Sequence, residues 1–221
     1  MYLPKHFEQP DAAAVQALIA AAPLATLVAM TPQGLTANLL PMEFVLAGDA
    51  GGPHGTLRGH VARANPIWRE AAPEHDVLAV FTGPQAYISP NGYPSKREHG
   101  KVVPTWNYAV VHARGTLAVI EDADWLRALV TRLTDQHEAS SAVPWKVSDA
   151  PGDYIAQMLK AIVGIEIRIS SLTAKWKVSQ NRSSADQLGT AAGLLAQPGD
   201  DAQAMAALVS PAVPPPRAPG G

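Results

Sequence analysis

The densest group of chemically versatile side chains in this sequence is the octet at residues 101–108, Lys-Val-Val-Pro-Thr-Trp-Asn-Tyr. It places two aromatic rings, a side-chain amide and a hydroxyl next to one another, directly before a β-favouring run at residues 109–115. A flat heteroaromatic ligand fits such a group, because its faces need stacking partners and its edge needs hydrogen-bond donors and acceptors. The alternative is a capped strand that packs its tryptophan, and the octet alone does not decide between the two.

Two further segments could bind an anion. Residues 59–66 lie where a strand is expected to end and a helix to begin, so free backbone N–H groups would accompany His60 and Arg63 at a phosphate site. Residues 175–182, Lys-Trp-Lys-Val-Ser-Gln-Asn-Arg, place polar side chains among three cations after a strand. The competing interpretations are a capped helix with a solvent-facing arginine for the first segment and a solvated basic turn for the second.

Composition limits the class of protein. A chain of 221 residues with 47% hydrophobic and 16% charged residues can bury one good core. A net charge of −2 and a pI of about 6.4 disfavour a nucleic-acid-binding domain, whose pI usually exceeds about 9. Zero cysteines exclude disulfides and Cys-ligated zinc. The sequence lacks a membrane-length apolar stretch and an apolar signal segment at its start, so we expect no membrane association and a cytoplasmic location.

Local charge gives a second indication of an anionic ligand. Residues 58–69 contain three arginines and no acid, and residues 160–182 contain five basic residues against the single acid Glu166. Two basic segments in a mildly acidic protein suit a small anionic ligand better than a long phosphate backbone.

The elements that must position these residues are mostly strands. Turn residues, prolines and hydrophobic periodicity predict strands at 24–30, 35–46 (interrupted at Pro41), up to 59–60, 77–82, 87–88, 105–120, 162–169 and 175–179. They predict helices at 11–22, 61–71, 122–135, 152–161 and 183–195, with loops at 48–53 and 89–100. Few helices separate the strands, which favours a mainly β, mostly antiparallel barrel decorated by helices. We expect one domain over 1–196 and an Ala/Pro-rich tail over 197–221 that is disordered or loosely packed.

Several common catalytic signatures are missing from the sequence. It contains no dinucleotide-binding or P-loop glycine motif and no nucleophile elbow. Its seven histidines show no i, i+4 pair or other metal-ligand spacing, so no metal is predicted. No catalytic residue can be assigned.

Taken in order, several segments resemble the PaiB-type FMN-binding negative transcriptional regulators. The matching segments are Tyr2–Phe7, Gly59–Pro66, Gly83–Pro90, Val103–Tyr108, His137-Glu138 and Lys177–Arg182. The resemblance runs from residue 2 to about residue 195. The sequence departs from the family at Leu39, where a histidine is frequent, and at residues 91–93, where Asn-Gly-Tyr replaces a more usual Ser-Trp-Tyr.

The resemblance implies an FMN-binding split barrel, similar to the pyridoxamine phosphate oxidases, that forms a homodimer with flavin sites at the interface. It implies that His60 and Arg63 face the FMN phosphate. It places Thr105, Trp106 and Asn107 along the isoalloxazine ring or ribityl chain. It also implies that four residues approach the flavin from the partner subunit, namely Lys177, Gln180, Asn181 and Arg182.

These observations lead to one main functional hypothesis and two alternatives. The main one is an FMN-binding, PaiB-like regulator that acts through flavin binding, because we find no helix-turn-helix with a basic recognition face. Direct DNA binding stays open, although the helix at 122–135 holds two arginines against three aspartates. The alternatives are an FMN-dependent oxidoreductase or flavin reductase acting on a small molecule, and a haem- or metabolite-binding split barrel.

Overall fold

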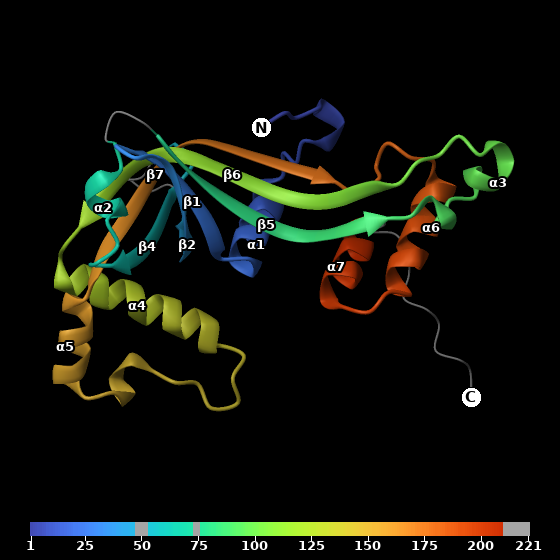
Figure 1. Cartoon of the computed structure of the whole chain (residues 1–221). Coiled ribbons are helices and arrows are strands. Elements are labelled where there is room, and N and C mark those ends of the chain that lie inside the picture. The colour runs from blue at the N-terminus through green and yellow to red at the C-terminus, as the bar shows by residue number, and fades with distance from the viewer. Residues whose placement is uncertain (47–52, 73–75, 210–221) are drawn as a thin grey trace. The chain divides into compact units, whose positions relative to one another are not determined.

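The described residues, 1–46, 53–72 and 76–209, contain seven strands that form one sheet in this computed structural model (Figure 1). The strands follow the order β2-β1-β5-β6-β7-β4-β3. The pairs β1–β2, β1–β5, β3–β4 and β4–β7 are antiparallel. The bounds are β1 Leu24–Thr31, β2 Gly34–Pro41, β3 Glu43–Val45, β4 Thr56–Ala62, β5 Val77–Ile88, β6 Thr105–Ile120 and β7 Ile162–Lys177.

The two edge strands of the sheet, β2 and β3, are consecutive in the chain, which brings the two edges near each other as in a split barrel. Only Met42 separates β2 from β3, and its backbone N–H donates to the carbonyl of Pro23 at 2.9 Å. Strand side chains alternate between the interior and the outer surface, as in β1, where Ala25, Leu27 and Ala29 are buried. The predicted mainly β fold with helices, of the split-barrel type, is confirmed.

Close backbone contacts shape this barrel. A Cβ added at Gly115 on β6 would lie 2.0 Å from the carbonyl oxygen of Arg168 on β7. Only glycine permits that approach, so Gly115 allows the two strands to lie close together at this point.

The chain divides into two units, which we describe separately. The barrel unit comprises Ala12–Phe81 and Val111–Thr173, and the terminal unit comprises Met1–Asp11, Thr82–Val110 and Ala174–Gly221. Strands β5, β6 and β7 contribute residues to both units.

The barrel unit carries the helices α1 Ala12–Ala21, α2 Ile67–Glu70, α4 Ala123–Glu138 and α5 Gly152–Lys160, and the 3-10 turn Val147–Asp149. Asp122 caps α4 as predicted, since its carboxylate accepts a hydrogen bond from the N–H of Trp125 at 2.7 Å. The terminal unit carries α3 Ser95–His99, α6 Ser184–Leu195 and α7 Asp200–Val209, with 3-10 turns at Lys5–Phe7 and Pro90–Gly92. No helix in the described ranges has the length and apolar character needed to cross a bilayer.

Three predictions of local structure were wrong. The helix expected at 61–71 is limited to α2, because β4 continues to pair with β7 as far as Ala62 and Pro66 delays the helix start. The two strands expected at 77–82 and 87–88 form the single strand β5, which runs through Pro84. The run expected to end at 169 and resume at 175 is likewise one strand, β7. Most of the loop predicted at 48–53 lies outside the described residues.

The C-terminal segment also differs from the prediction. Part of the expected tail, residues 200–209, forms helix α7, which lies beside α6 (Figure 1). Its apolar residues recur at helical spacing and are buried, namely Ala202, Met205, Ala206 and Val209. An alanine-rich composition concealed this periodicity in the sequence. Residues 210–221 lie outside the described part of the chain.

Candidate functional site

In the terminal unit, the start of β6 and the end of β7 bring together several of the predicted ligand-binding residues. Thr105, Trp106 and Asn107 open β6, and Lys177 closes β7. The Lys177 ammonium donates to the hydroxyl of Thr105 and to the backbone carbonyl of Trp106, the latter at 2.6 Å. This side chain therefore ties the two strands together at the octet identified in the sequence.

A tight turn follows β7 and carries the other predicted residues. The side chain of Gln180 accepts from the N–H of Val178 at 2.8 Å and donates to the carbonyl of Trp176. The N–H of Arg182 donates to the carbonyl of Ser179 at 2.9 Å. Asn181 is exposed on this turn. Gln180 thus shapes the turn by its own contacts, while Asn181 faces solvent.

Three cations gather at this turn without a close ion-pair partner in the described part of the chain. We call Lys175, Lys177 and Arg182 the basic cluster. Among the described residues, no carboxylate lies within 4.0 Å of these cations. Desolvation lowers the pKa of the Lys177 ammonium, and the charges of Lys175 and Arg182 lower it further. An anion bound here would relieve that repulsion.

Lys175 is held differently from the other two cations. It is 7% exposed, and its ammonium donates to the backbone carbonyl of Tyr2 at 3.2 Å. The rings of Tyr2, Phe7 and Tyr108 lie 5.7, 5.9 and 5.4 Å from its nitrogen. Lys175 is therefore a fixed buried charge, and Lys177 and Arg182 are the cations more accessible to a ligand.

Aromatic surface lies on β6 and on its neighbour β5. Trp106 is 50% exposed, and its indole N–H donates to the side chain of Gln85 at 3.1 Å. The ring of Tyr87 meets it edge-on, with centroids 6.2 Å apart. The exposed indole is available for stacking against a planar ligand.

In the barrel unit, His60 lies on β4 with a buried Nδ1 that has no hydrogen-bond partner among the described residues. Burial lowers the pKa of its imidazole, so His60 is neutral at physiological pH. A neutral imidazole can donate or accept one hydrogen bond through this nitrogen, but it contributes no charge to an anion site.

Arg63 follows β4 and is already engaged within the barrel unit. Its guanidinium donates to the Glu121 carboxylate at 2.5 Å and to the carbonyls of Lys160 and Ile162 at 2.9 and 3.2 Å. The expected free N–H groups of a following helix are also few, since Pro66 has none and that of Ile67 bonds the side chain of Asn65. A phosphate at Arg63 would compete with Glu121.

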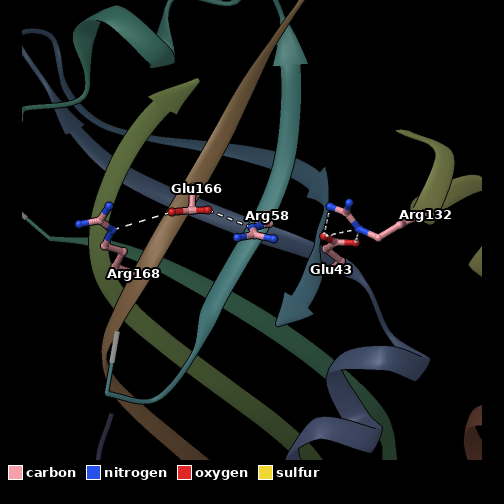
Figure 2. A network of polar contacts seen from close by, with 5 residues as sticks. All are labelled: Glu43, Arg58, Arg132, Glu166 and Arg168. Carbon is pink, nitrogen blue, oxygen red and sulfur yellow. Dashed lines mark hydrogen bonds and ion pairs between the residues drawn. The ribbon is translucent and has the colours of Figure 1, made fainter. Parts of the chain in front are cut away.

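Other arginines of the barrel unit are likewise paired, as Figure 2 shows. Arg132 on α4 binds both carboxylate oxygens of Glu43 on β3, with contacts of 2.6–3.1 Å. Arg58 on β4 lies 2.9 Å from Glu166 on β7, and Arg168 lies 3.8 Å from the same carboxylate. The segment at 58–69 contains no acid in sequence, yet acids distant in the chain neutralise Arg58 and Arg63. Arg69, the third arginine of that segment, has no ion pair among the described residues, and its guanidinium lies 4.1 Å from the centroid of the Trp68 ring.

The sequence analysis missed three residues that contribute to this arrangement. Ser179 bonds the buried amide of Asn107, Lys175 completes the basic cluster, and Gln85 bonds Trp106. Lys175 and Ser179 lie in the basic segment at 175–182, and Gln85 lies in the segment Gly83–Pro90 of the family resemblance, but their partners are distant in sequence. The left-handed backbone of Ser179, with φ 65°, has no signal in the sequence, because serine seldom adopts it.

Comparison with known proteins identifies the family of the chain. Residues 1–171 match the family described as "Putative FMN-binding domain". The chain is 32% identical over 209 residues to the protease synthase and sporulation protein PAI 2 of Bacillus subtilis, covering 95% of this chain and 96% of that protein. It is 36% identical over 171 residues to an uncharacterized protein of Aspergillus fumigatus, covering 63% of this chain and 66% of that one.

Solved structures support the fold. The flavocytochrome Anf3 of Azotobacter vinelandii superposes with a TM-score of 0.54 at 13% identity, covering 80% of this chain and 72% of that one. An FAD- and haem-binding protein of Mycobacterium smegmatis superposes with a TM-score of 0.53 at 14% identity, covering 76% and 72%. With its family match over residues 1–171 and its similarity to PAI 2 over nearly its full length, this chain belongs to the FMN-binding domain family of the PaiB type.

Proposed function

We propose that the protein is a cytoplasmic, homodimeric, PaiB-like regulator that responds to bound FMN. The observation that carries this proposal is the unpaired basic cluster beside exposed Trp106 and buried Asn107. FMN combines a dianionic phosphate with a planar ring that has donors and acceptors at its edge, and these three kinds of residue match its three recognition features.

The residues present fit FMN, and we propose roles for all nine predicted ones. Lys177 and Arg182 of the terminal unit supply charge for the phosphate. In a homodimer with the flavin at its interface, Arg63 and His60 would come from the other copy of the chain, and they contribute less because Arg63 is paired with Glu121 and His60 is neutral. Trp106 stacks, and Thr105, Asn107 and Asn181 offer hydrogen bonds to the ring or ribityl chain. Gln180 holds the turn that carries Asn181 and Arg182, because both halves of its amide bond the backbone. When bound, FMN can carry hydride or electron transfer, while the protein supplies binding and orientation.

A homodimer is supported by an uncovered apolar face on the barrel. Leu35 and Leu39 on edge strand β2 are 74% and 65% exposed. The register places Leu35 opposite Met30 and Pro41 opposite Leu24 on β1, and those side chains are exposed too. A second copy of the chain is the proposed occupant of this face, which a monomer would leave in water. Leu39, where the family often has histidine, makes the face more apolar.

Regulation through the flavin is better supported than direct reading of DNA. Helix α4 carries Asp124 and Asp135 as well as its two arginines, and Arg132 is bonded to Glu43. DNA binding relies on many unpaired cations that displace counterions from phosphates. A regulatory effect would then pass through a partner protein or through the flavin's redox state.

The test is titration of the purified chain with FMN and riboflavin, followed by absorbance and by flavin fluorescence. We expect one FMN per chain and a weaker affinity for riboflavin, which lacks the phosphate. A protein that binds neither flavin contradicts the proposal, and a haem titration would then test the alternative ligand. Oxidation of nicotinamide cofactors by the FMN-loaded protein would favour the oxidoreductase alternative, and salt-sensitive binding to duplex DNA would favour direct DNA reading.

A further inference from the structure

Ser179 has an unusual backbone conformation at the end of β7. Its φ is 65°, and it is the one non-glycine residue with positive φ in the described part of the chain. The side chain is buried as well. A residue with a Cβ is disfavoured in this left-handed region, so its surroundings must hold it there. Such strained residues persist where surrounding contacts over-determine them, and they cluster at functional sites.

The turn around Ser179 does not need the serine hydroxyl. The backbone carbonyl of Ser179 accepts from the N–H of Arg182, and the side chain of Gln180 bonds the backbone of Val178 and Trp176. These contacts close the turn by themselves. The hydroxyl instead accepts a hydrogen bond from Nδ2 of Asn107 at 2.9 Å, 72 residues away in the sequence.

The amide of Asn107 is thereby only half satisfied. Asn107 is 1% exposed, and its Oδ1 is buried with no partner among the described residues. A hydroxyl can either donate or accept, so Ser179 can hold either half of the amide and leave the other half open. A buried, unpaired amide group costs free energy that a ligand's donor or acceptor would recover.

We propose that Ser179 is a positioning residue, which binds one half of the Asn107 amide so that the other half is presented to the flavin ring or ribityl chain. This inference rests on the proposed FMN function. The left-handed backbone of Ser179 is maintained because that conformation brings the Ser179 hydroxyl to Asn107. Lys177, at the end of β7, bonds Thr105 and Trp106 at the start of β6. These contacts hold together the two segments that carry Ser179 and Asn107.

The test is a double-mutant cycle on the dissociation constants for FMN and riboflavin. Ser179→Ala should weaken the binding of both flavins by about 3- to 10-fold, since it removes one neutral hydrogen bond. Asn107→Ala should weaken their binding by about 10-fold or more. If Ser179 acts through Asn107, the double variant should bind no more weakly than Asn107→Ala. An effect of Ser179→Ala that adds in full to that of Asn107→Ala would overturn the proposal, and so would unchanged binding by Ser179→Ala.

Ser179→Gly separates the hydroxyl from the backbone strain. Glycine accepts positive φ, so this variant should unfold at a temperature equal to or above that of Ser179→Ala, yet bind flavin as weakly. Wild-type affinity in Ser179→Gly would overturn the assigned role of the hydroxyl. If the wild-type protein binds neither flavin, the proposed function fails and this inference with it; if it binds and the serine variants match it, only this inference fails.

Discussion

The carboxylate of Asp186 on α6 accepts two hydrogen bonds from Ser95, which precedes it by 91 residues. The N–H of Ser95 lies 3.2 Å from one carboxylate oxygen and its hydroxyl 2.8 Å from the other. Burial raises the pKa of Asp186, but the bonds from Ser95 and Ser183 and the charge of Arg182 outweigh burial and lower it. Because Asp186 is buried, these bonds fix the start of α3 on α6 in the terminal unit.

Asp186→Asn should lower the free energy of unfolding by about 1.5–3 kcal/mol, because hydrogen bonds to a charged, buried group are replaced by weaker ones. Urea denaturation near neutral pH measures the change. The lowered pKa means that the ionised carboxylate keeps its stabilising effect above pH 3.8 and loses it as the pH falls through the lowered value. Asp135→Asn, at an exposed position on α4, is the matched control and should change little. Equal stability of the two variants would show that the Ser95 contact contributes nothing.

Two glycines on α6 make a second matched pair. A Cβ at Gly189 would lie 1.9 Å from the carbonyl oxygen of Gly92, whereas one at Gly193 would meet nothing within 4 Å. Gly189→Ala should therefore lower the unfolding temperature, because the 3-10 turn at Pro90–Gly92 must move away from α6. Gly193→Ala should raise the free energy of unfolding by about 0.5–1 kcal/mol through higher helix propensity. Thermal unfolding of both variants decides; a Gly189→Ala protein as stable as Gly193→Ala would contradict the close packing.

Arg63 is ion-paired and Lys177 has no ion pair among the described residues, so their substitutions should have unequal effects on the affinity for FMN. Lys177→Met should weaken FMN binding roughly tenfold or more by removing a charge-assisted contact. It should also reduce the preference for FMN over riboflavin. Arg63→Met should weaken FMN by less than about threefold, because Glu121 already occupies the guanidinium. Titrations of both variants with both flavins measure this difference. A larger effect of Arg63→Met than of Lys177→Met would indicate that the phosphate binds in the barrel unit.

The strand pattern could be predicted from the sequence because alternation and turn residues are local signals. β1, β2 and β6 begin and end within a few residues of their predicted bounds, and the break at Pro41 falls between β2 and β3. The helix at 61–71 could not be predicted correctly, since whether β4 continues to Ala62 depends on pairing with β7, about 100 residues later. Local propensity carries no information about such a partner.

The residue types of the candidate site could be predicted from the sequence, but the contacts between those residues could not. The sequence showed that cations gather at 58–69 and at 175–182, but Glu166 and Glu121, which are distant in sequence, pair with Arg58 and Arg63 of the first group. The role of Ser179 depends on a backbone angle and on Asn107, which no local pattern reports. Charge counted along the chain therefore overstated the free charge of the first segment, because it does not report ion pairs with acids that are distant in sequence.

The packing of α7 gives a prediction opposite to that of an unstructured tail. Met205 on α7 is fully buried and α7 packs beside α6, so Met205→Ala should cost about 2–5 kcal/mol of unfolding free energy. Gln203→Ala, on the exposed side of the same helix, should cost almost nothing. Urea denaturation compares them. Truncation after Gln197 should destabilise the protein as well, and a truncated chain with wild-type stability would show that α7 contributes no packing energy.

The buried imidazole of His60 predicts that stability falls on mild acidification. Its pKa is lowered from 6.5 in the folded protein by burial, so below pH 6.5 the unfolded chain binds more protons than the folded one. The free energy of unfolding must then decrease as the pH falls through this range. His112, whose pKa is lowered mainly by burial, acts in the same direction. His60→Gln should therefore reduce, without abolishing, the stability difference between about pH 7.5 and about pH 5.5. Exposed His54 provides the control, and a His60→Gln protein that keeps the full pH dependence of His54→Gln would show that His60 titrates normally when folded.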